Sequence, residues 1–370
     1  MERKVIEEIV RIFLIEDLEI EEEKIAPEAK LKDDLGIDSL DFVDIVVIVE
    51  KNFGSKIKPE EMQGVVTLSQ FCDYIESKVG YVKNTTFGSA WMHRQLVNSL
   101  RVMDVRALYL FSTLFIMPVC LLLNTNHSRT MAYRYFRKRL GYSRFRAAWC
   151  TYRNHCLFGT VVIDRFAMFA GRKFELKIEG YENFSRLAVQ ENGFMILSSH
   201  IGCYEVAGFS LVAKTKRFNA LVFGGEKAFV MEGRRERLEN NNIRMIPVMP
   251  DMSHLFLVNE ALSNHEIVSM PADRIVGPAK TLTVNFLGAK ARLPMGPFSV
   301  ATMRELNVIA VNVMKTSFKG YTVFVSPLFY DKEASRKVQI QQLAESYATD
   351  LEKRVRQFPT QWYNFYDFWS

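Results

Sequence analysis

The sequence predicts a multidomain chain: a small all-α head of four short helices, followed by an α/β body with a mostly parallel central sheet. The distribution of charge separates an acidic N-terminal part from a basic remainder. Residues 1–79 hold 10 Lys or Arg against 20 Asp or Glu, whereas the rest of the chain holds 38 against 22. After Gly171, short apolar runs alternate with amphipathic stretches, a pattern typical of α/β domains. We therefore expect a head at 1–79, a linker at 80–103 and a body at 104–370.

The acidic head has the pattern of a helical domain. Residues 2–17 place apolar side chains at helical spacing, which predicts an amphipathic helix. The next pattern is D-D-L-G-I-D-S-L-D-F-V-D-I-V-V-I-V-E at 33–50, in which Asp38 is placed to cap a second helix. Ser39 is thus expected at a helix N-terminus, surrounded by acidic side chains.

This segment resembles an acyl carrier protein over about all of residues 1–79, through D-S-L and the L-G-I-D that overlaps it. The resemblance implies that Ser39 carries a 4′-phosphopantetheine arm, added by a phosphopantetheinyl transferase, whose thiol holds an acyl thioester. It also implies that the acidic helix after Ser39 docks on a basic partner, and here a basic body is covalently attached. The alternative is that Ser39 is an unmodified cap in a helical docking module, because serine caps helices well.

The start of the body is apolar and then basic. Residues 107–123 carry no charge, and their 17 residues lie at the lower limit for a membrane-spanning helix, with Pro118 inside. Three interpretations are open: a spanning helix, a buried helix, and a helix lying at the inner leaflet. The basic run at 129–146 favours contact with a membrane on its cytoplasmic side.

The pattern of apolar residues in the body predicts seven strands, a hairpin and a long terminal helix. The strands are expected near 173–179, 194–199, 219–224, 244–248, 266–271, 308–315 and 321–328, with a hairpin at 283–293 around Gly288 and a long terminal helix near 335–356. Helical patterns separate several of these strands, so most of the sheet is expected to be parallel.

Polar residues follow the second of these strands. The stretch G-F-M-I-L-S-S-H-I-G-C-Y-E at 193–205 places His200 and Glu205 where an α/β sheet opens into a crevice. On one continuous helix their spacing would turn the side chains about 140° apart, so His200 is expected on the turn and Glu205 in the following helix. The carboxylate would then hold one imidazole nitrogen while the other takes a proton. A purely structural His beside a Glu is the competing interpretation.

Several motifs in this order resemble the glycerolipid acyltransferase superfamily, and within it the branch of bacterial lipid A late (lauroyl/myristoyl-type) acyltransferases. They are S-S-H-I-G-C-Y-E at 198–205, P-A-D-R at 271–274, F-L-G-A-K-A-R-L-P-M-G-P at 286–297 and P-T-Q-W-Y-N-F-Y-D-F-W at 359–369. The resemblance covers roughly residues 100–370. It implies that His200 is the general base and that Glu205 is its orienting partner.

The second motif departs from that branch, which more often has Asp-Gln where this chain has Asp273 and Arg274. We expect both residues in the substrate-binding site, where Asp273 would organise the site. Arg274 would bind a phosphate or carboxylate of the acceptor, or the phosphate of the pantetheine arm. The alternative is that Arg274 only forms a salt bridge with an acidic side chain. Glu226 and Lys227 are further candidates for contacting the acceptor. Backbone N–H groups near Gly202, or Arg274, are candidate oxyanion donors, and Gly202 would let a substrate approach the backbone.

Other chemistries are less favoured. Neither Ser198 nor Ser199 lies in a G-x-S-x-G nucleophile elbow. The histidines show no spacing typical of a metal site, so no metal is expected. The basic body has no recognition-helix or zinc-ligand pattern, so nucleic acid is not expected as a partner. Five cysteines without framework spacing favour reduced thiols in the cytoplasm.

The expected function is acyl transfer at the cytoplasmic face of a bacterial inner membrane. The chain would move an acyl group from the phosphopantetheine thioester of its own carrier domain, or that of a neighbouring copy, to a hydroxyl or amine of a lipid acceptor. The alternative is a non-catalytic carrier or scaffold protein that docks lipid or polyketide enzymes at the membrane. A His200→Ala substitution separates the two.

Overall fold

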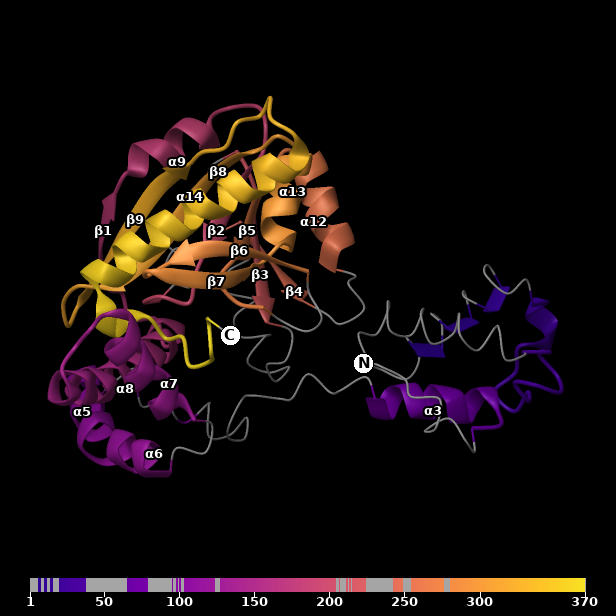
Figure 1. The fold of residues 1–370 in the computed structure, drawn as a ribbon, viewed down its shortest axis with the longest axis horizontal. Helices are drawn as coiled ribbons and strands as arrows, with labels where there is room; N and C mark the ends of the chain where they lie inside the picture. Colours follow the sequence, from indigo (N-terminus) through magenta and orange to yellow (C-terminus); the bar gives the residue numbers. More distant parts are fainter. Residues whose placement is uncertain are drawn as a thin grey trace. The chain divides into compact units, whose positions relative to one another are not determined.

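The computed structural model divides the chain into two units, one built on residues 1–86 and the other holding most of residues 87–370 (Figure 1). The structure describes residues 6, 7, 10, 11, 14, 15, 20–37, 65–78, 95, 98, 100, 103–123, 127–203, 206, 211, 213, 215–223, 242–248, 254–275 and 280–369. The predicted boundaries of the head, linker and body stay predictions.

The first unit has a helical core. Ile6, Val10 and Leu14 are almost fully buried at four-residue spacing and are helical, which confirms the helix predicted for 2–17 at its described positions. They pack with apolar side chains of helix α3 (Leu68–Lys78) in one cluster. Ser39 and the helix expected after it lie outside the described residues.

A seven-stranded sheet forms the centre of the second unit, in the order β1-β9-β8-β2-β5-β3-β4. Its strands β8 and β9 pair antiparallel, whereas the pairs β1–β9, β2–β8, β2–β5 and β3–β5 are parallel. This confirms the mostly parallel sheet, and each strand begins and ends within two residues of its predicted position. The strands are β1 (Glu175–Glu179), β2 (Phe194–Ser198), β3 (Phe218–Phe223), β4 (Ile243–Val248), β5 (Ile267–Pro271), β8 (Asn307–Lys315) and β9 (Gly320–Leu328).

A separate antiparallel hairpin and a set of helices surround this sheet. The hairpin is β6 (Thr281–Phe286) with β7 (Ala289–Pro294), as predicted. The helical segments are η1 (Glu22–Lys24) in the first unit and, in the second, α5 (Val105–Phe111), η3 (Ser112–Ile116), α6 (Met117–Leu123), α7 (Ser128–Arg134), η4 (Tyr135–Arg139), α8 (Arg144–Phe169), α9 (Tyr181–Ala188), α12 (His254–Ser263), α13 (Gly296–Met303), α14 (Arg336–Gln357) and η6 (Pro359–Gln361).

Different helices cover the two faces of the sheet. On β8, Val311 and Val313 belong to a core cluster that includes Phe184 of α9. Asn312 points to the other face, where its amide donates to Oδ2 of Asp350 on α14 at 2.9 Å. Side chains alternate along a strand, so β8 separates the α9 side from the α14 side. Figure 1 shows α14 lying across the sheet and the hairpin.

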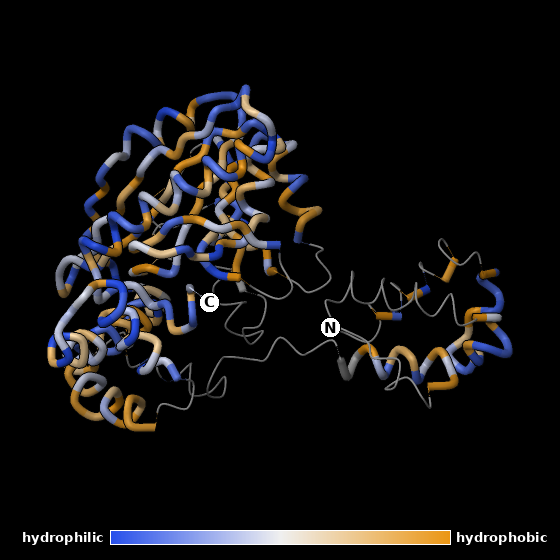
Figure 2. Tube along the Cα trace, viewed as in Figure 1, coloured by the Kyte–Doolittle hydropathy of each residue, from blue (hydrophilic) through white to orange (hydrophobic). Residues whose placement is uncertain are grey.

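The segment Val105–Leu123 is an apolar helix with a mean hydropathy of 1.9, and only 17% of its most apolar stretch is buried. By length and composition it could cross a membrane. The interpretation of this stretch as a buried helix is therefore wrong. In Figure 2 much of this helix is coloured orange, the colour of hydrophobic residues. The exposed large apolar side chains are Leu110, Phe111, Leu114, Phe115, Ile116, Val119, Leu122 and Leu123, and Phe145 and Trp149 of α8 are exposed as well.

The other side of this helix is tied to the body through one buried carboxylate. Asp164 of α8 is 0% exposed and accepts hydrogen bonds from the hydroxyls of Tyr109 and Tyr321. It also forms an ion pair with Lys315 at the end of β8. A buried carboxylate needs such partners to remain charged. Asp164 therefore joins the apolar helix, α8 and the sheet.

Candidate active site

Two predicted site residues follow neighbouring strands. His200 stands two residues after β2, and Asp273 stands two residues after β5. These strands are parallel, with Ser198 opposite Pro271, and the pairing continues as Ala272 N–H donates to the Ser198 carbonyl at 3.0 Å. Because the carboxyl ends of parallel strands lie at one edge of the sheet, residues 73 positions apart meet there.

The carboxylate of Asp273 binds His200 at two points. Its Oδ1 lies 2.7 Å from His200 Nδ1, and its Oδ2 accepts the His200 backbone N–H at 2.8 Å. The Asp273 side chain is 4% exposed, whereas that of His200 is 24% exposed. A carboxylate only accepts, so Nδ1 carries the proton and Nε2 is the basic nitrogen.

This environment keeps Asp273 ionised. Burial by itself would raise the pKa of the carboxyl, but the charge of His200, the two hydrogen bonds from His200 and the charge of Arg274 outweigh it, so the Asp273 pKa lies below its ordinary value. Asp273 was predicted as a substrate-binding residue that organises the site. Its two carboxylate oxygens hold the imidazole and the backbone N–H of His200, an arrangement that suits a residue which orients the candidate base.

Two tyrosines support this edge of the sheet. The Tyr366 hydroxyl donates to the Asp273 backbone carbonyl at 2.6 Å, and the Tyr347 hydroxyl donates to the Ser198 carbonyl at 2.9 Å. Burial, and then the charge of Asp273, raise the pKa of Tyr366. Both phenols therefore remain donors at neutral pH and hold the backbone on which His200 and Asp273 stand.

The C-terminal segment runs along the His200 turn. Ile201 forms an antiparallel bridge with Trp362, and Tyr363 N–H donates to the His200 carbonyl at 3.1 Å. Gln361 holds the end of β8, because its side chain donates to the Lys315 carbonyl at 2.8 Å and accepts the Lys315 N–H at 2.9 Å. The turn is thus fixed between β8 and the chain's last residues, a role that the tail motif alone did not reveal.

Gly202 differs from its expected role. Its φ is +59°, and a Cβ there would lie 1.8 Å from the Val313 carbonyl oxygen, so the backbone that approaches it is β8 and not a substrate. Its N–H donates to the Gln361 carbonyl, and the next N–H, of Cys203, donates to Val313, each at 2.8 Å. These two N–H groups are engaged in the fold, so the expectation that they stabilise an oxyanion is not met.

Arg274 lies beside the pair. Its Nη2 donates to the Tyr363 carbonyl at 3.4 Å, and its Cζ lies 5.7 Å from the centre of the Tyr366 ring. Among the described residues, no acidic side chain forms an ion pair with Arg274. Arg274 remains the candidate donor to an oxyanion or an anionic substrate group.

The remaining predicted residues fall into two groups. Glu205, Glu226 and Lys227, like Ser39, lie outside the described residues, so their roles stay predictions. Ser199 is 2% exposed and donates to Asn312 Oδ1 at 2.7 Å, a contact inside the fold that does not suit a nucleophile. Among the described residues, no three His, Cys, Asp or Glu side chains gather as metal ligands.

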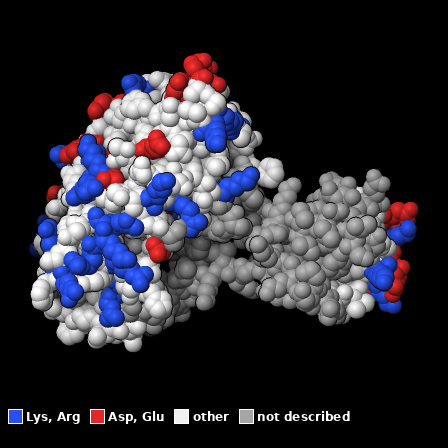
Figure 3. Space-filling view, in the orientation of Figure 1, with Lys and Arg blue, Asp and Glu red and all other residues white. Residues whose placement is uncertain are grey.

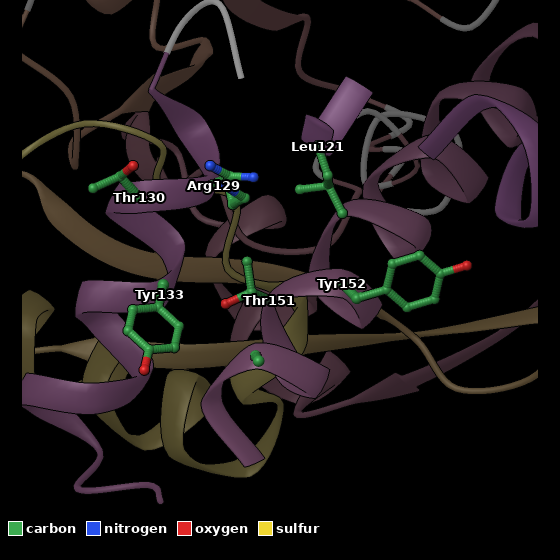
Figure 4. A pocket seen from close by; sticks show the side chains of 7 residues that line it. Leu121, Arg129, Thr130, Tyr133, Thr151 and Tyr152 are labelled. Atoms are coloured by element: carbon green, nitrogen blue, oxygen red, sulfur yellow. The ribbon is translucent and has the colours of Figure 1, made fainter. Parts of the chain in front are cut away.

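A groove of about 260 Å³ lies among the helices α6, α7 and α8 (Figure 4). None of its lining residues contributes to the His200–Asp273 pair. They are Leu121, Arg129, Thr130, Tyr133, Ala148, Thr151 and Tyr152. The groove is therefore a feature of the helical layer.

The C-terminal part of the chain matches a known family. Residues 162–370, more than half of the chain, match the family "Bacterial lipid A biosynthesis acyltransferase". The chain belongs to that family. Both His200 and Asp273, and the C-terminal segment that holds them, lie in the matched region of this acyltransferase.

The head matches a second family. Residues 8–75 match the family "Phosphopantetheine attachment site". The acyl carrier protein of Thermotoga maritima is 41% identical over 71 residues, which make up 19% of this chain and 88% of that protein. The acyltransferase therefore carries its own acyl carrier domain, whose cofactor is covalently bound phosphopantetheine.

One solved structure with a partial likeness is the 1-acyl-sn-glycerophosphate (LPA) acyltransferase PlsC from Thermotoga maritima. It is 16% identical, with 66% of this chain and 99% of that chain covered and a TM-score of 0.29.

Proposed function

We propose that this chain moves a fatty acyl group from the phosphopantetheine thioester of its carrier domain to a hydroxyl or amine of a lipid acceptor. The observation that carries the proposal is the His200–Asp273 pair, at the carboxyl edge of the sheet in an acyltransferase fused to its own carrier. Membership of an acyltransferase family favours catalysis over the scaffold alternative.

His200 acts as the general base. Its Nε2 removes the acceptor's proton as the acceptor oxygen or nitrogen attacks the acyl carbonyl, and Asp273 stabilises the imidazolium that forms. The tetrahedral intermediate then collapses with cleavage of the C–S bond, and the imidazolium returns the proton to the departing pantetheine sulfur, which leaves as the free thiol. Arg274 donates to the oxyanion or binds an anionic group of the acceptor. The phosphopantetheine arm supplies the acyl group as a reactive thioester, and no covalent acyl-enzyme is needed.

Residues outside the described part complete the proposal. Ser39 is the attachment residue of the arm, by its D-S-L motif. Glu205 is the proposed orienting partner of His200, and Glu226 and Lys227 are proposed to contact the acceptor. A phosphopantetheinyl transferase installs the arm.

The site of action is the cytoplasmic face of a bacterial inner membrane. The exposed apolar surface of Val105–Leu123 supports this assignment, as does the basic surface of the neighbouring helices, where Lys and Arg side chains gather in Figure 3. Exposed basic residues there are Arg129, Arg134, Lys138, Arg144 and Arg146. Anionic lipid head groups attract such a surface, and exposed apolar side chains bury themselves in the leaflet.

Vesicle binding tests the membrane assignment. Leu114→Asp/Phe115→Asp alters side chains that are 55% and 62% exposed, so it should lower binding to anionic phospholipid vesicles while leaving the melting temperature unchanged. Phe329→Asp, at a side chain 70% exposed outside the helical layer, is the matched control and should bind like wild type. Equal binding by all three chains would contradict the assignment.

Complementation tests transfer and its geometry together. Each of His200→Ala and Ser39→Ala should abolish transfer from the chain's own carrier. If mixing them restores activity, the carrier of one copy serves the base of another, and if it does not, transfer is intramolecular. Wild-type rates in the His200→Ala chain would overturn the proposed base.

A further inference from the structure

Two side chains of the C-terminal segment and the Asp273 turn, Asn364 and Arg274, contain buried polar atoms that form no hydrogen bond among the described residues. Asn364 is only 7% exposed, and neither its Oδ1 nor its Nδ2 has a hydrogen-bond partner in the described part of the chain. The Nε of Arg274 is likewise buried without a partner there. Leaving buried polar groups unpaired costs free energy, so native structures seldom do it without a functional reason.

Arg274 contacts the backbone directly before Asn364. Arg274 Nη2 contacts the carbonyl of Tyr363, which belongs to the peptide bond that joins Tyr363 to Asn364. The backbone N–H of that same Tyr363 donates to the His200 carbonyl. Asn364 therefore directly follows Tyr363, the residue through which the C-terminal segment pairs with the turn that holds His200.

The side chains of this segment alternate. Tyr363 and Phe365 both contact Phe158 of α8, whereas Trp362 and Tyr366 both contact Phe368. An extended chain places alternate residues on opposite sides, so Asn364 shares the side of Tyr366. That side holds the Asp273 carbonyl, which Tyr366 binds, and the Arg274 guanidinium over the Tyr366 ring.

We propose that Asn364 and Arg274 form a subsite that binds a secondary amide of the substrate beside His200. The Asn364 amide offers donors and an acceptor, and Arg274 Nε adds a donor. A secondary amide has one N–H, which suits Asn364 Oδ1, and one carbonyl oxygen, whose lone pairs suit Asn364 Nδ2 and Arg274 Nε. Because both ends of the Asn364 amide lack a partner, the match holds whichever way that amide is turned.

A phosphate or carboxylate alone fits less well. Such a group offers only acceptors, so it satisfies Arg274 but leaves Asn364 Oδ1 unpaired. We therefore replace the expectation that Arg274 binds a phosphate or carboxylate with the proposal that Arg274 and Asn364 together bind a secondary amide. This inference rests on the proposed function, in which one substrate is a pantetheine thioester, and the pantetheine arm carries secondary amides along its length. An N-acylated lipid acceptor carries the same group.

Binding measurements on the full-length Ser39→Ala chain, which has no arm of its own, test the subsite. The probe is an S-alkyl pantetheine, in which a thioether replaces the thioester, and its matched control is the same alkyl chain joined by a thioether to mercaptoethanol, which has no amide. The pantetheine compound should bind about tenfold more tightly or better. In the Ser39→Ala/Asn364→Leu chain the two compounds should bind with equal affinity. If the pantetheine compound still binds more tightly to this chain, the proposal is overturned.

A second pair of ligands identifies the source of the amide. If the subsite serves the acceptor, Asn364→Leu weakens binding of an N-acylated glucosamine phospholipid and leaves lysophosphatidic acid, which has no amide, unchanged. If Asn364→Leu removes the affinity difference between the pantetheine compound and its mercaptoethanol control, and does not change binding of either lipid, the subsite binds the pantetheine arm. No effect of Asn364→Leu on either pair refutes it.

Thermal stability provides a readout that does not depend on substrate. Asn364 has no hydrogen bond to lose, so Asn364→Leu should keep or raise the melting temperature. Asn154→Leu is the matched control, because the Asn154 amide donates to the carbonyls of Thr360 and Trp362 at 3.0 Å each, and its loss should lower the melting temperature. An equal decrease in both variants would show that Asn364 serves the fold.

The outcomes separate this subsite from the proposed function. If His200→Ala abolishes transfer while Asn364→Leu changes neither binding nor rate, the function stands and the subsite fails. If the wild-type chain transfers no acyl group but binds the pantetheine probe through Asn364, the subsite stands and the function fails.

Discussion

Asp273 and His200 are joined by two hydrogen bonds, one to the imidazole and one to the backbone N–H of the same residue, at 2.7 and 2.8 Å. The backbone contact fixes the position of the turn, and the imidazole contact fixes the ring and its tautomer. A single buried carboxylate therefore sets both the location and the protonation pattern of the candidate base.

Asp273→Asn should separate orientation from binding. The amide retains the size of the side chain but favours the wrong imidazole tautomer, so we expect kcat to fall by about a thousandfold with KM little changed. Steady-state kinetics checks this, with the exposed Asp331→Asn as a charge-loss control. A kcat within a few-fold of wild type would exclude Asp273 as the orienting residue.

Gly202→Ala should destabilise the domain through the β8 contact. A Cβ at Gly202 meets the Val313 carbonyl at 1.8 Å, whereas at Gly288, with φ +77°, nothing lies within 4 Å. Gly288→Ala isolates the backbone strain and should cost about 1–2 kcal/mol of unfolding free energy. Gly202→Ala should cost more than about 3 kcal/mol, because β8 must move. Equal costs in urea unfolding would show that the clash is relieved without consequence.

The ion pair between Lys315 and Asp164 should respond asymmetrically to substitution. Lys315→Met leaves a charge at a carboxylate that is 0% exposed, so we expect a loss of about 3–5 kcal/mol of unfolding free energy. Asp164→Asn/Lys315→Met removes the charge, and the amide can accept from one of the two tyrosine hydroxyls while donating to the other, so this variant should be less destabilised than the single variant. Additive losses in this double-mutant cycle would mean that the two residues are not coupled.

His155 should make the domain less stable in mild acid. Burial lowers the pKa of His155 below its ordinary 6.5, although its hydrogen bond to the Thr151 carbonyl partly opposes this. Above pH 6.5 neither state is protonated, and as pH falls below that value the unfolded chain takes up a proton that the folded chain resists.

The consequence is measurable against a variant that cannot titrate. Relative to His155→Gln, the wild-type unfolding free energy should decline by at most about 1.4 kcal/mol per pH unit below the ordinary pKa. Parallel stability curves for the two chains between neutral and mildly acidic pH would contradict the assigned direction.

Most strands of the central sheet could be predicted from the sequence because they are bounded apolar runs, such as β2 (F-M-I-L-S), whereas β1 (E-L-K-I-E) is an exposed strand of alternating character. The role of Asp273 was harder to predict because its contact with His200 depends on which strands become neighbours. Local spacing favoured Glu205, five residues from His200, whereas β5 brings Asp273 beside it from the next parallel strand. The place of Asp273 directly after an apolar run was the available signal.

The roles of Gln361 and Asn364 could not be predicted for the same reason. Their motif was visible as a Trp-rich tail, but only the folded chain brings Gln361 to Lys315 and Tyr363 to His200. Gly202 shows the converse error, since a glycine that suggested an approaching substrate accommodates the backbone of β8.

The most direct test of the central claim follows the acyl group by intact mass. The full chain is loaded with acyl-phosphopantetheine and mixed with vesicles that contain a lipid acceptor, and both the carrier mass and the lipid are measured over time. The account predicts that wild type loses the acyl mass as acylated lipid appears, that His200→Ala keeps it, and that Ser39→Ala is never loaded. Discharge of His200→Ala at the wild-type rate, or loading of Ser39→Ala, would contradict the account.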